Sequence, residues 1–399
     1  MTDFDPFALA ARQVELDRAS TTRIPALYER KKLRLAPTPH AFLRGSAPLF
    51  YEILAARPEL ATGPDGQGWI VGDMHLENVG AYRTDADEVT FGLNDFDDAT
   101  VGPLRLDVLR LSTSVLLAGR GFRATGAQAI TLVEHLLASY LEALGGGDAP
   151  GLPEIVSELV DRVKDRSRKA LLDDRAPEDS HGKRRFLRGD RYLDLPPDIE
   201  ARVPALLAAY VAALGDRAPG KAAEWKAEDS ALRVAGNGSL GVLRIAVLVK
   251  DRAGDERLLE LKECRRSATE ALPTHVPPPV GLWTHPAERV TRAASALLAA
   301  PPRHLAAVHL GDLSLAGRRL FPQEDKLDLE SMHAGAALDE LVKFIGHALG
   351  AAHARGVAAL GGSAQRPWTG EEVATVVDQA ITLAGMLEGV SLAWVRRNR

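Results

Sequence analysis

Three polar residues, close together in the chain, have the types and spacing needed to orient a nucleophile and to bind a divalent metal. Asp73 and Asn78 lie five positions apart in GDMHLEN, and Asp95 follows in LNDFDDA, seventeen residues after Asn78. Transfer of a phosphoryl group needs a carboxylate to accept the proton of the attacking hydroxyl, and it needs oxygen ligands for Mg²⁺. This set supplies both kinds of group. The same residues could instead cap the turns of a hairpin.

A glycine-rich segment between two strand-like runs forms a second candidate site. Its backbone N–H groups could fold over phosphates, as the flap of a kinase does. The same G-x-G-x-x-G spacing marks dinucleotide-binding folds, but there a helix follows the glycines at once. Here VLRIAVLVK follows and reads as a strand, which favours the kinase-like flap. The candidate nucleotide-binding residues of this segment are Gly236, Asn237, Gly238, Ser239 and Gly241.

Lys262 lies on the next strand-like run, LLELKEC, twenty-one residues after Gly241. A charged residue in an apolar strand is costly unless it is paired, so Lys262 is interpreted as a cation that grips the α- and β-phosphates of a nucleotide. Such a lysine needs a carboxylate from a helix to hold it. We expect this partner to be Glu288, in AERVTRAASALLAA, with Glu270 as the alternative.

Several residues near these motifs have two readings each. His75 could contact phosphate or a metal, although a histidine in such a loop more often holds the backbone by hydrogen bonds. Arg44 in AFLRG could bind phosphate or an acidic substrate, or form a structural salt bridge. Cys264 is expected to be a small core residue.

The elements that position these residues follow from hydrophobic spacing. Residues 3–61 are predicted to be mostly helical, and a strand, a loop and a second strand carry the Asp73 and Asp95 motifs. Helices are predicted at LRLDVLRLSTSVLLAGR, at AQAITLVEHLLASYLEAL, near 200–214, at LDELVKFIGHALGAAHARG and at EEVATVVDQAITLAGML. Between them, LRVAGNGSLGVLRIAVLVK and RLLELKEC predict β-hairpins, and HLAAVHLG and RRLFPQE predict a strand pair joined by the turn DLSLAG.

Residues 162–192 hold 11 Lys or Arg against 6 Asp or Glu, with little periodicity over RAPEDSHGKRRFLRGDRY. We expect an exposed loop there. Its positive charge could attract an anionic substrate, although a charge run is usually only a solvated segment.

Length and composition limit the classes of protein. A chain of 399 residues fits two lobes, and 46% hydrophobic with 26% charged residues is a globular balance. A net charge of −5 gives no sign of nucleic-acid binding. The single cysteine excludes an internal disulfide framework. The start of the chain lacks the pattern of a secretory signal, and no apolar run suggests a membrane partner, so a cytoplasmic location is expected.

The motifs GDMHLEN, LNDFDDA, VGPLRLDVLRLS, AFLRG, GNGSLG and LELKEC resemble a bacterial family known as domain of unknown function 2252, over most of the chain. They are also similar to the aminoglycoside- and choline-kinase branch of the kinase-like superfamily, whose catalytic loop reads H-G-D-x-x-x-x-N and is followed by a metal-binding Asp. This resemblance implies Asp73 as the catalytic base, Asn78 and Asp95 as magnesium ligands and Lys262 as the phosphate lysine. It further implies that Asp107 braces the catalytic loop.

The sequence departs from that superfamily in three ways. Val71 stands where its catalytic loop has His, and Asp97 stands where protein kinases have Gly. The catalytic loop also precedes the glycine loop by about 160 residues, although kinases have the opposite order. A circular permutation accounts for this order, because the helix ending at 353–356 would then lie just before the catalytic loop in space.

We therefore expect an α+β, two-lobed, circularly permuted kinase-like fold. Residues 1–221 and 325–399 would form the helical lobe, and residues 222–324 the β-rich nucleotide lobe inserted between them. ATP with Mg²⁺ would occupy the cleft, with adenine at a hinge near 321–324 that includes Gln323. The expected activity is transfer of the γ-phosphoryl group to the hydroxyl of a small molecule. A protein acceptor or nucleotidyl transfer is the second reading, and a non-catalytic nucleotide-binding scaffold is the third.

Overall fold

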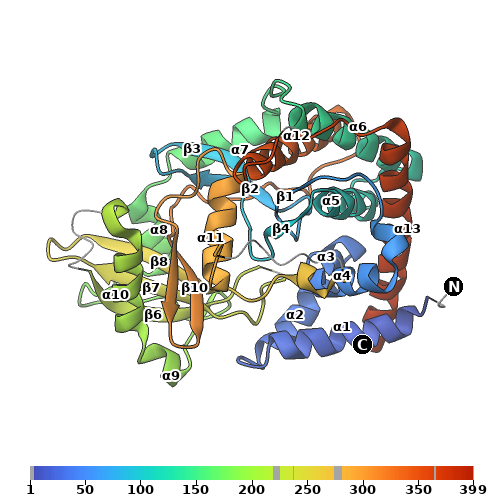
Figure 1. Cartoon of the computed structure of the whole chain (residues 1–399). Coiled ribbons are helices and arrows are strands. Elements are labelled where there is room, and N and C mark those ends of the chain that lie inside the picture. The colour runs from blue at the N-terminus through green and yellow to red at the C-terminus, as the bar shows by residue number, and fades with distance from the viewer. Residues whose placement is uncertain (1–3, 219–224, 237, 274–280, 364, 399) are drawn as a thin grey trace.

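The chain forms a mixed α and β fold, which a computed structural model describes at residues 4–218, 225–236, 238–273, 281–363 and 365–398 (Figure 1). The helices are α1 (Pro6–Ser20), α2 (Leu27–Leu35), α3 (Pro39–Leu43), α4 (Ala47–Ala56), α5 (Arg105–Ala118), α6 (Gly126–Leu144), α7 (Glu154–Lys164), α8 (Arg168–Arg175), α9 (Pro197–Glu200), α10 (Val203–Leu214), α11 (Pro286–Leu297), α12 (Ala336–Ala358) and α13 (Gly370–Arg397), with short 3₁₀ turns η1 (Pro58–Ala61), η2 (Gly215–Arg217) and η4 (Ala268–Ala271). The strands are β1 (Gln67–Ile70), β2 (Val79–Arg83), β3 (Val89–Leu93), β4 (Thr100–Pro103), β5 (Tyr192–Leu193), β6 (Lys226–Arg233), β7 (Arg244–Lys250), β8 (Glu256–Glu263), β9 (Ala306–Leu310) and β10 (Leu313–Arg319).

A six-stranded antiparallel sheet has the order β5-β6-β7-β8-β10-β9. Side chains alternate between the two faces of a strand. On β7 and β8, Ile245, Val247 and Leu259 face the apolar layer under α10. Arg244, Glu260 and Lys262 have the opposite parity and therefore lie on the other face, so this face carries the charged groups.

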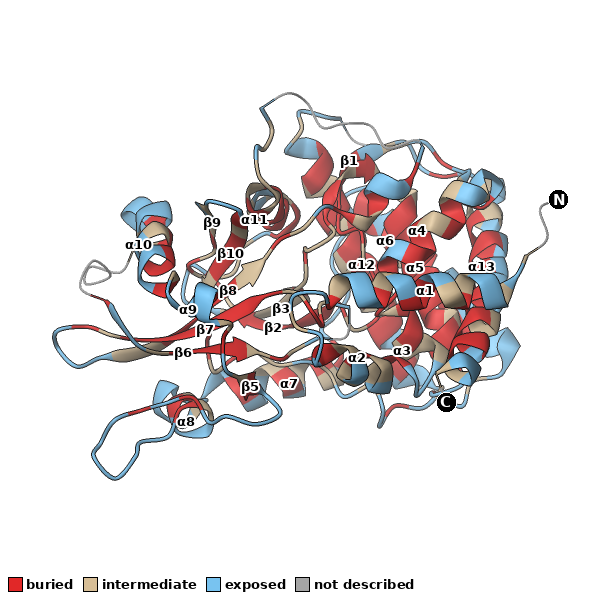
Figure 2. Cartoon of the chain, turned by 90° about the horizontal axis from the view of Figure 1, so that it is seen from below, coloured by how far each residue is buried: buried red, intermediate tan, exposed pale blue. Residues whose placement is uncertain are grey.

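Helices form the other part of the molecule around the largest apolar core, to which α1, α4, α5, α6, α12 and α13 contribute (Figure 2). Helix α12 lies closely against α6, because a Cβ at Gly346 or Gly350 would be within 2.4 Å of α6 backbone oxygens. Thr369 caps α13 through a capping box with Glu372. The close packing of α12 fixes the residues at its C-terminal end, which lie beside β1.

Two small antiparallel strand pairs lie between the sheet and the helices. Strand β1 pairs with β4, and β2 pairs with β3. Helix α11 packs on β9 and β10 of the large sheet and also on α12 and β1, and it stands between the two parts in Figure 1. The loops that end β1 and β3 therefore open toward the charged face of the sheet.

Most of the predicted elements are confirmed. The structure has the helical N-terminal region, α5, α6, α10, α12, α13 and the hairpin strands β6 to β8. Two predictions are wrong. The expected turn DLSLAG is mostly strand β10, with the turn at Gly311, and the expected loop at 162–192 contains the end of α7 and the whole of α8. Gly317 interrupts the alternation of apolar and polar residues in LSLAGRR. In α8, the many charged residues leave too few apolar ones to give a clear helical spacing.

The predicted boundary at residue 221 also differs from the packing. Strand β5 belongs to the large sheet, and α10 covers it, with Val203, Leu206 and Tyr210 buried against its apolar face. The sheet part of the molecule thus begins before residue 222. The reason is that the apolar stripe of α10 has its partner surface on β6 and β9.

Helix α13 is long and apolar enough, by length and composition, to cross a membrane. Half of its most apolar window is buried inside the fold, where α13 packs against α1 and α5. A core helix passes the same test, and this packing accounts for its composition.

Candidate functional site

The loop after β1 is held in place by a buried carboxylate. Asp107, at the start of α5, accepts hydrogen bonds from the backbone N–H groups of Val71 (2.6 Å) and Gly72 (2.8 Å). His353 of α12 lies 3.0 Å from the same carboxylate, and both side chains are completely buried. Gly72 has φ +79°, and a Cβ there would lie 2.1 Å from the carbonyl oxygen of Asp98. Only glycine fits at this turn, which directs the next residue, Asp73, into the site.

Among the residues that the structure describes, side-chain hydrogen bonds reach only one oxygen of the Asp73 carboxylate. Its Oδ1 accepts a hydrogen bond from Nε of Arg110 at 2.7 Å and a second from Nη2. The Arg110 side chain is fully buried, whereas that of Asp73 is 21% exposed. Burial raises the pKa of Asp73 to about 7, although Arg110 opposes this shift. A base with a pKa near neutrality suits proton transfer, and Oδ2 faces the cavity that Asp73 lines.

Asn78 and Asp95 lie together, and they offer the kinds of oxygen that Mg²⁺ prefers. The Asn78 amide nitrogen donates to the carbonyl oxygens of Asp73 (3.2 Å) and Asp95 (3.1 Å). Its Oδ1 is buried and accepts no hydrogen bond from any residue that the structure describes. Mg²⁺ prefers oxygen ligands, typically one or two carboxylates together with substrate phosphates. Within the described ranges, no group of three or more His, Cys, Asp or Glu is arranged to hold a metal, so phosphate oxygens would have to complete the shell.

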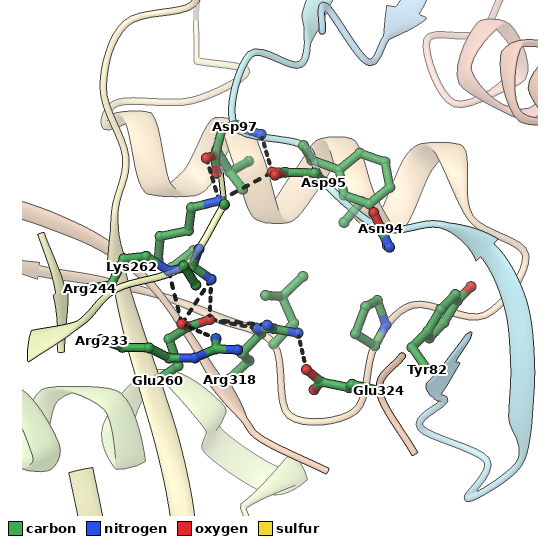
Figure 3. A pocket seen from close by; sticks show the side chains of 18 of the residues that line it. Tyr82, Asn94, Asp95, Asp97, Arg233, Arg244, Glu260, Lys262, Arg318 and Glu324 are labelled. Atoms are coloured by element: carbon green, nitrogen blue, oxygen red, sulfur yellow. Dashed lines mark hydrogen bonds and ion pairs between the residues drawn. The ribbon is translucent and has the colours of Figure 1, made fainter. Parts of the chain in front are cut away.

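Lys262 reaches across from β8 to the segment after β3. Its Nζ donates to Asp95 Oδ1 at 3.2 Å and forms a shorter ion pair with Asp97 (Figure 3). Burial and the neighbouring Asp95 raise the pKa of Asp97 to about 6, while Lys262 opposes the shift. For Asp95, burial would raise the pKa, but Lys262, Lys326 and Arg244 together hold it below its ordinary value.

The predicted partner of Lys262 is wrong. Glu288 lies at the start of α11 and accepts hydrogen bonds from Thr284 N (2.8 Å) and Oγ1 (3.1 Å). The alternative, Glu270, completes a capping box with Ser267. Helix α11 instead directs the buried Arg289 to the carbonyl oxygens of Asp97, Ala99 and Arg265. The free backbone N–H groups at the start of a helix stabilise a carboxylate in its first turn. Glu288 is therefore held at this end of α11 and does not pair with Lys262.

The glycine segment lies between β6 and β7 and approaches the Asp73 loop. A Cβ at Gly238 would be 2.9 Å from the carbonyl oxygen of Arg44 and 3.9 Å from Asp73 Oδ2. Glycine at this position therefore permits a close backbone approach that a side chain would prevent. Ser239 lies between Gly238 and the turn ending at Gly241, which has φ +97°. The predicted residue Asn237 lies outside the described residues.

Two cavities meet at Asp95 and Asp97. The first, of about 330 Å³, is lined by Lys262, by Gly236 and by apolar side chains that include Val290 and Ala294 of α11. The second, of about 200 Å³, is lined by Asp73 and Gly238. Asp95, Asp97, Gly236 and Lys326 line both. The arrangement provides two adjacent binding spaces with carboxylates at their junction.

The remaining predicted residues have structural contacts. Arg44 forms an ion pair with Glu77 at 2.5 Å, and the His75 ring nitrogen accepts a hydrogen bond from the Glu77 N–H. Gln323 is buried, and its amide donates to the carbonyl oxygens of Lys164 and Arg166. Gln323 is not among the residues that line either cavity, although Glu324 lines the first. Cys264 is buried, as expected.

The basic segment is neutralised by local pairing. Arg184 contacts Asp173, Glu178 and Glu256, and Arg188 contacts Asp194 and Asp229. These pairs attach the segment to β6 and β8. They satisfy much of the positive charge that an anionic ligand would otherwise attract.

Arg110 and Glu260 are not among the predicted site residues, although the sequence pattern marks both as unusual. Arg110 is the one charged residue in the apolar run VLRLSTSVLL, and Glu260 precedes Lys262 by two positions on the same strand. A buried charge requires a partner, and alternation places Glu260 on the face of Lys262. The partners themselves come from distant segments, so the sequence does not identify them.

Fold and site together define a mixed α and β protein in which a charged sheet face and a carboxylate-bearing loop enclose two adjoining cavities. A family model described as "Uncharacterized protein conserved in bacteria (DUF2252)" matches residues 23–397. The chain belongs to this family, as its motifs predicted. No curated protein and no solved structure matches the chain.

Proposed function

We propose that the protein is an ATP- and magnesium-dependent phosphotransferase that moves the γ-phosphoryl group to a hydroxyl of a small molecule. The observation that carries the proposal is the junction of two cavities at Asp95. Lys262 and the glycine segment border one cavity, and Asp73 borders the other. Phosphoryl transfer depends mainly on positioning the two reactants in line and on stabilising charge.

In this proposal ATP occupies the larger cavity and the acceptor occupies the smaller one. Asp73 accepts the proton of the acceptor hydroxyl, whose oxygen bonds to the γ-phosphorus as the bond to the ADP oxygen breaks. Asn78 and Asp95 would hold Mg²⁺, which neutralises charge on the phosphate oxygens. The volume of about 200 Å³ and its many charged lining residues favour a small, polar acceptor.

The order of elements also supports a kinase-like nucleotide lobe. A glycine segment lies between β6 and β7, the lysine is on β8, and α11, β9 and β10 follow. Protein kinases have a glycine-rich loop, then a lysine on the third strand, then a helix. The C-terminal end of α12 lies beside β1, as a circular permutation requires, and a Cβ at Gly356 would lie only 3.0 Å from the carbonyl oxygen of Trp69. The permuted kinase-like fold is part of this proposal.

Mg-ATP is expected to raise the melting temperature, whereas ATP with a chelator is expected to have little effect. A ligand that binds only the folded state stabilises it by about 1.4 kcal/mol at ten times its Kd. The measurement is a thermal melt with millimolar Mg-ATP. Lys262→Ala should reduce the shift, and Lys250→Ala, which removes a more exposed lysine paired with Glu256, is the matched control. No shift in the wild type would count against the nucleotide site.

Product analysis then tests the reaction itself. Mass spectrometry of ATP incubated with candidate hydroxyl acceptors distinguishes ADP with a phosphorylated product from pyrophosphate with a nucleotidylated product. Appearance of neither product with any acceptor class would favour a nucleotide-binding scaffold.

A further inference from the structure

A cluster of arginines surrounds one buried carboxylate on the charged face of the sheet (Figure 3). Glu260 of β8 is completely buried and accepts hydrogen bonds from Arg244 of β7, with two N–O distances of 3.0 Å. Arg318 of β10 donates to it at 3.1 Å, and Arg233 of β6 forms a third, shorter pair. Strands β6, β7 and β10 thus direct cations at a single carboxylate on β8.

The positive charge of this arginine cluster exceeds its negative charge. Glu324, 3.1 Å from Arg318, is the second carboxylate at the cluster. Burial would raise the pKa of Glu260, but the three arginines hold it well below its ordinary value, so Glu260 is ionised. In the part of the chain that the structure describes, three guanidinium groups therefore pair with two carboxylates. Since a guanidinium carries five N–H donors, donors remain after these pairs are made.

The arginine cluster borders the larger cavity and lies beneath the glycine segment. Arg233, Arg244 and Arg318 all line this cavity, together with Gly236. Arg244 Nη1 lies 3.4 Å from Ser239 Oγ in the glycine segment. Arg244 is the cross-strand partner of Lys262 in the β7–β8 pair, and paired residues of antiparallel strands lie roughly 5 Å apart. Two cationic positions at this separation can hold different phosphates of one polyphosphate.

A purely structural role does not explain why the cluster holds more arginines than carboxylates. A buried ion pair is weak evidence for stability, because desolvation offsets its Coulombic gain, and an excess of like charge increases that cost. Planar guanidinium groups match phosphate oxygens through paired hydrogen bonds. An anion in the cavity would accept hydrogen bonds from the guanidinium donors that the two carboxylates leave free.

We infer that Arg233, Arg244 and Arg318 form a second phosphate subsite, so that the larger cavity binds a polyphosphate between this arginine cluster and Lys262. The inference rests on the proposed function for the identity of that polyphosphate as a nucleotide. The phosphate in the subsite belongs either to the nucleotide itself or to a separate anion, and the two sources respond differently to the same substitution.

Arg318→Gln is the test substitution, because Arg318 is the most exposed of the three, at 27%, and Glu260 keeps Arg233 and Arg244. Arg202→Gln is the matched control. Arg202 is 28% exposed and pairs with Asp312, on the opposite side of the sheet part from the cavity lining. Calorimetry measures the affinities for inorganic tripolyphosphate without metal and for Mg-ATP. Loss of a charged hydrogen bond should weaken tripolyphosphate binding at least about tenfold in Arg318→Gln.

Each outcome decides a different question. Weaker binding of both ligands supports the subsite and identifies the nucleotide's own phosphates as its occupant. Weaker binding of tripolyphosphate with unchanged Mg-ATP affinity supports a subsite for a separate anion. If the wild type binds tripolyphosphate through Arg318 but not Mg-ATP, the subsite stands and the proposed function fails. The inference would be overturned by unchanged affinities in both Arg318→Gln and Arg233→Gln, or by a wild type that does not bind tripolyphosphate. If Arg318→Gln fails to fold, Arg233→Gln takes its place in the test.

Discussion

Asp73→Asn is expected to lower phosphoryl transfer by roughly two to four orders of magnitude while Mg-ATP affinity is retained, the typical contribution of a positioned general base. Asparagine has nearly the size of aspartate but cannot accept the proton. Its side-chain oxygen can still accept the hydrogen bond from Arg110 Nε, so the geometry of the loop should survive. The measurement pairs calorimetry with Mg-ATP and acceptor-dependent release of ADP.

Glu77→Gln is the matched control for Asp73→Asn. Glu77 lies on the same loop, loses its charge by the same kind of change, and pairs with Arg44 rather than lining a cavity. Its turnover should remain near that of the wild type. Joint loss of ATP binding and stability in Asp73→Asn would make Asp73 a structural partner of Arg110. No change in either quantity would show that the base lies elsewhere.

Asp95→Ala should reduce turnover by roughly a thousandfold or more, because metal stabilisation of transition-state charge is worth several kcal/mol. The substitution removes the carboxylate that accepts a hydrogen bond from Lys262, and it keeps the backbone carbonyl oxygen that accepts one from the Asn78 amide. A titration of activity against Mg²⁺ at fixed ATP measures the effect, and a thermal melt confirms folding.

Asp97→Asn separates the roles of the two carboxylates that bind Lys262. It keeps Asp95 and Asn78, so the Mg²⁺ dependence should change little while Lys262 retains one carboxylate partner. If Asp97→Asn shifts the Mg²⁺ dependence and Asp95→Ala does not, the metal ligand is Asp97, and the assignment to Asp95 is wrong.

Sequence patterns predicted the elements well where one face is apolar and the other polar. Helices α6 and α13 have such patterns, and the structure contains both, each with one buried stripe. Strand β10 was placed wrongly, because Gly317 interrupts its apolar alternation while packing against Tyr210, where a Cβ would lie 2.4 Å from the ring. A pattern that depends on a close tertiary contact is not visible in the strand alone.

The sequence predicted which residues lie in the candidate site, but it did not predict which of them form ion pairs with one another. The structure brings together Asp73, Asn78, Asp95, Asp107 and Lys262. Lys262 was expected to pair with Glu288, but the helix N-terminus already satisfies that carboxylate. The partners of buried charges depend on which distant segments meet, and Arg110 with Asp73 is such a case.

The buried amide of Gln323 joins the two backbone segments that connect the helical part with the sheet part. The chain enters the sheet part at 165–167, between α7 and α8, and leaves it after β10. Gln323, on the outgoing segment, donates to the carbonyl oxygens of Lys164 and Arg166, and Asp325 pairs with Arg166 at 2.7 Å. The two segments are therefore held side by side at this point, whereas η4 and α11 make further contacts between the sheet part and the helical part.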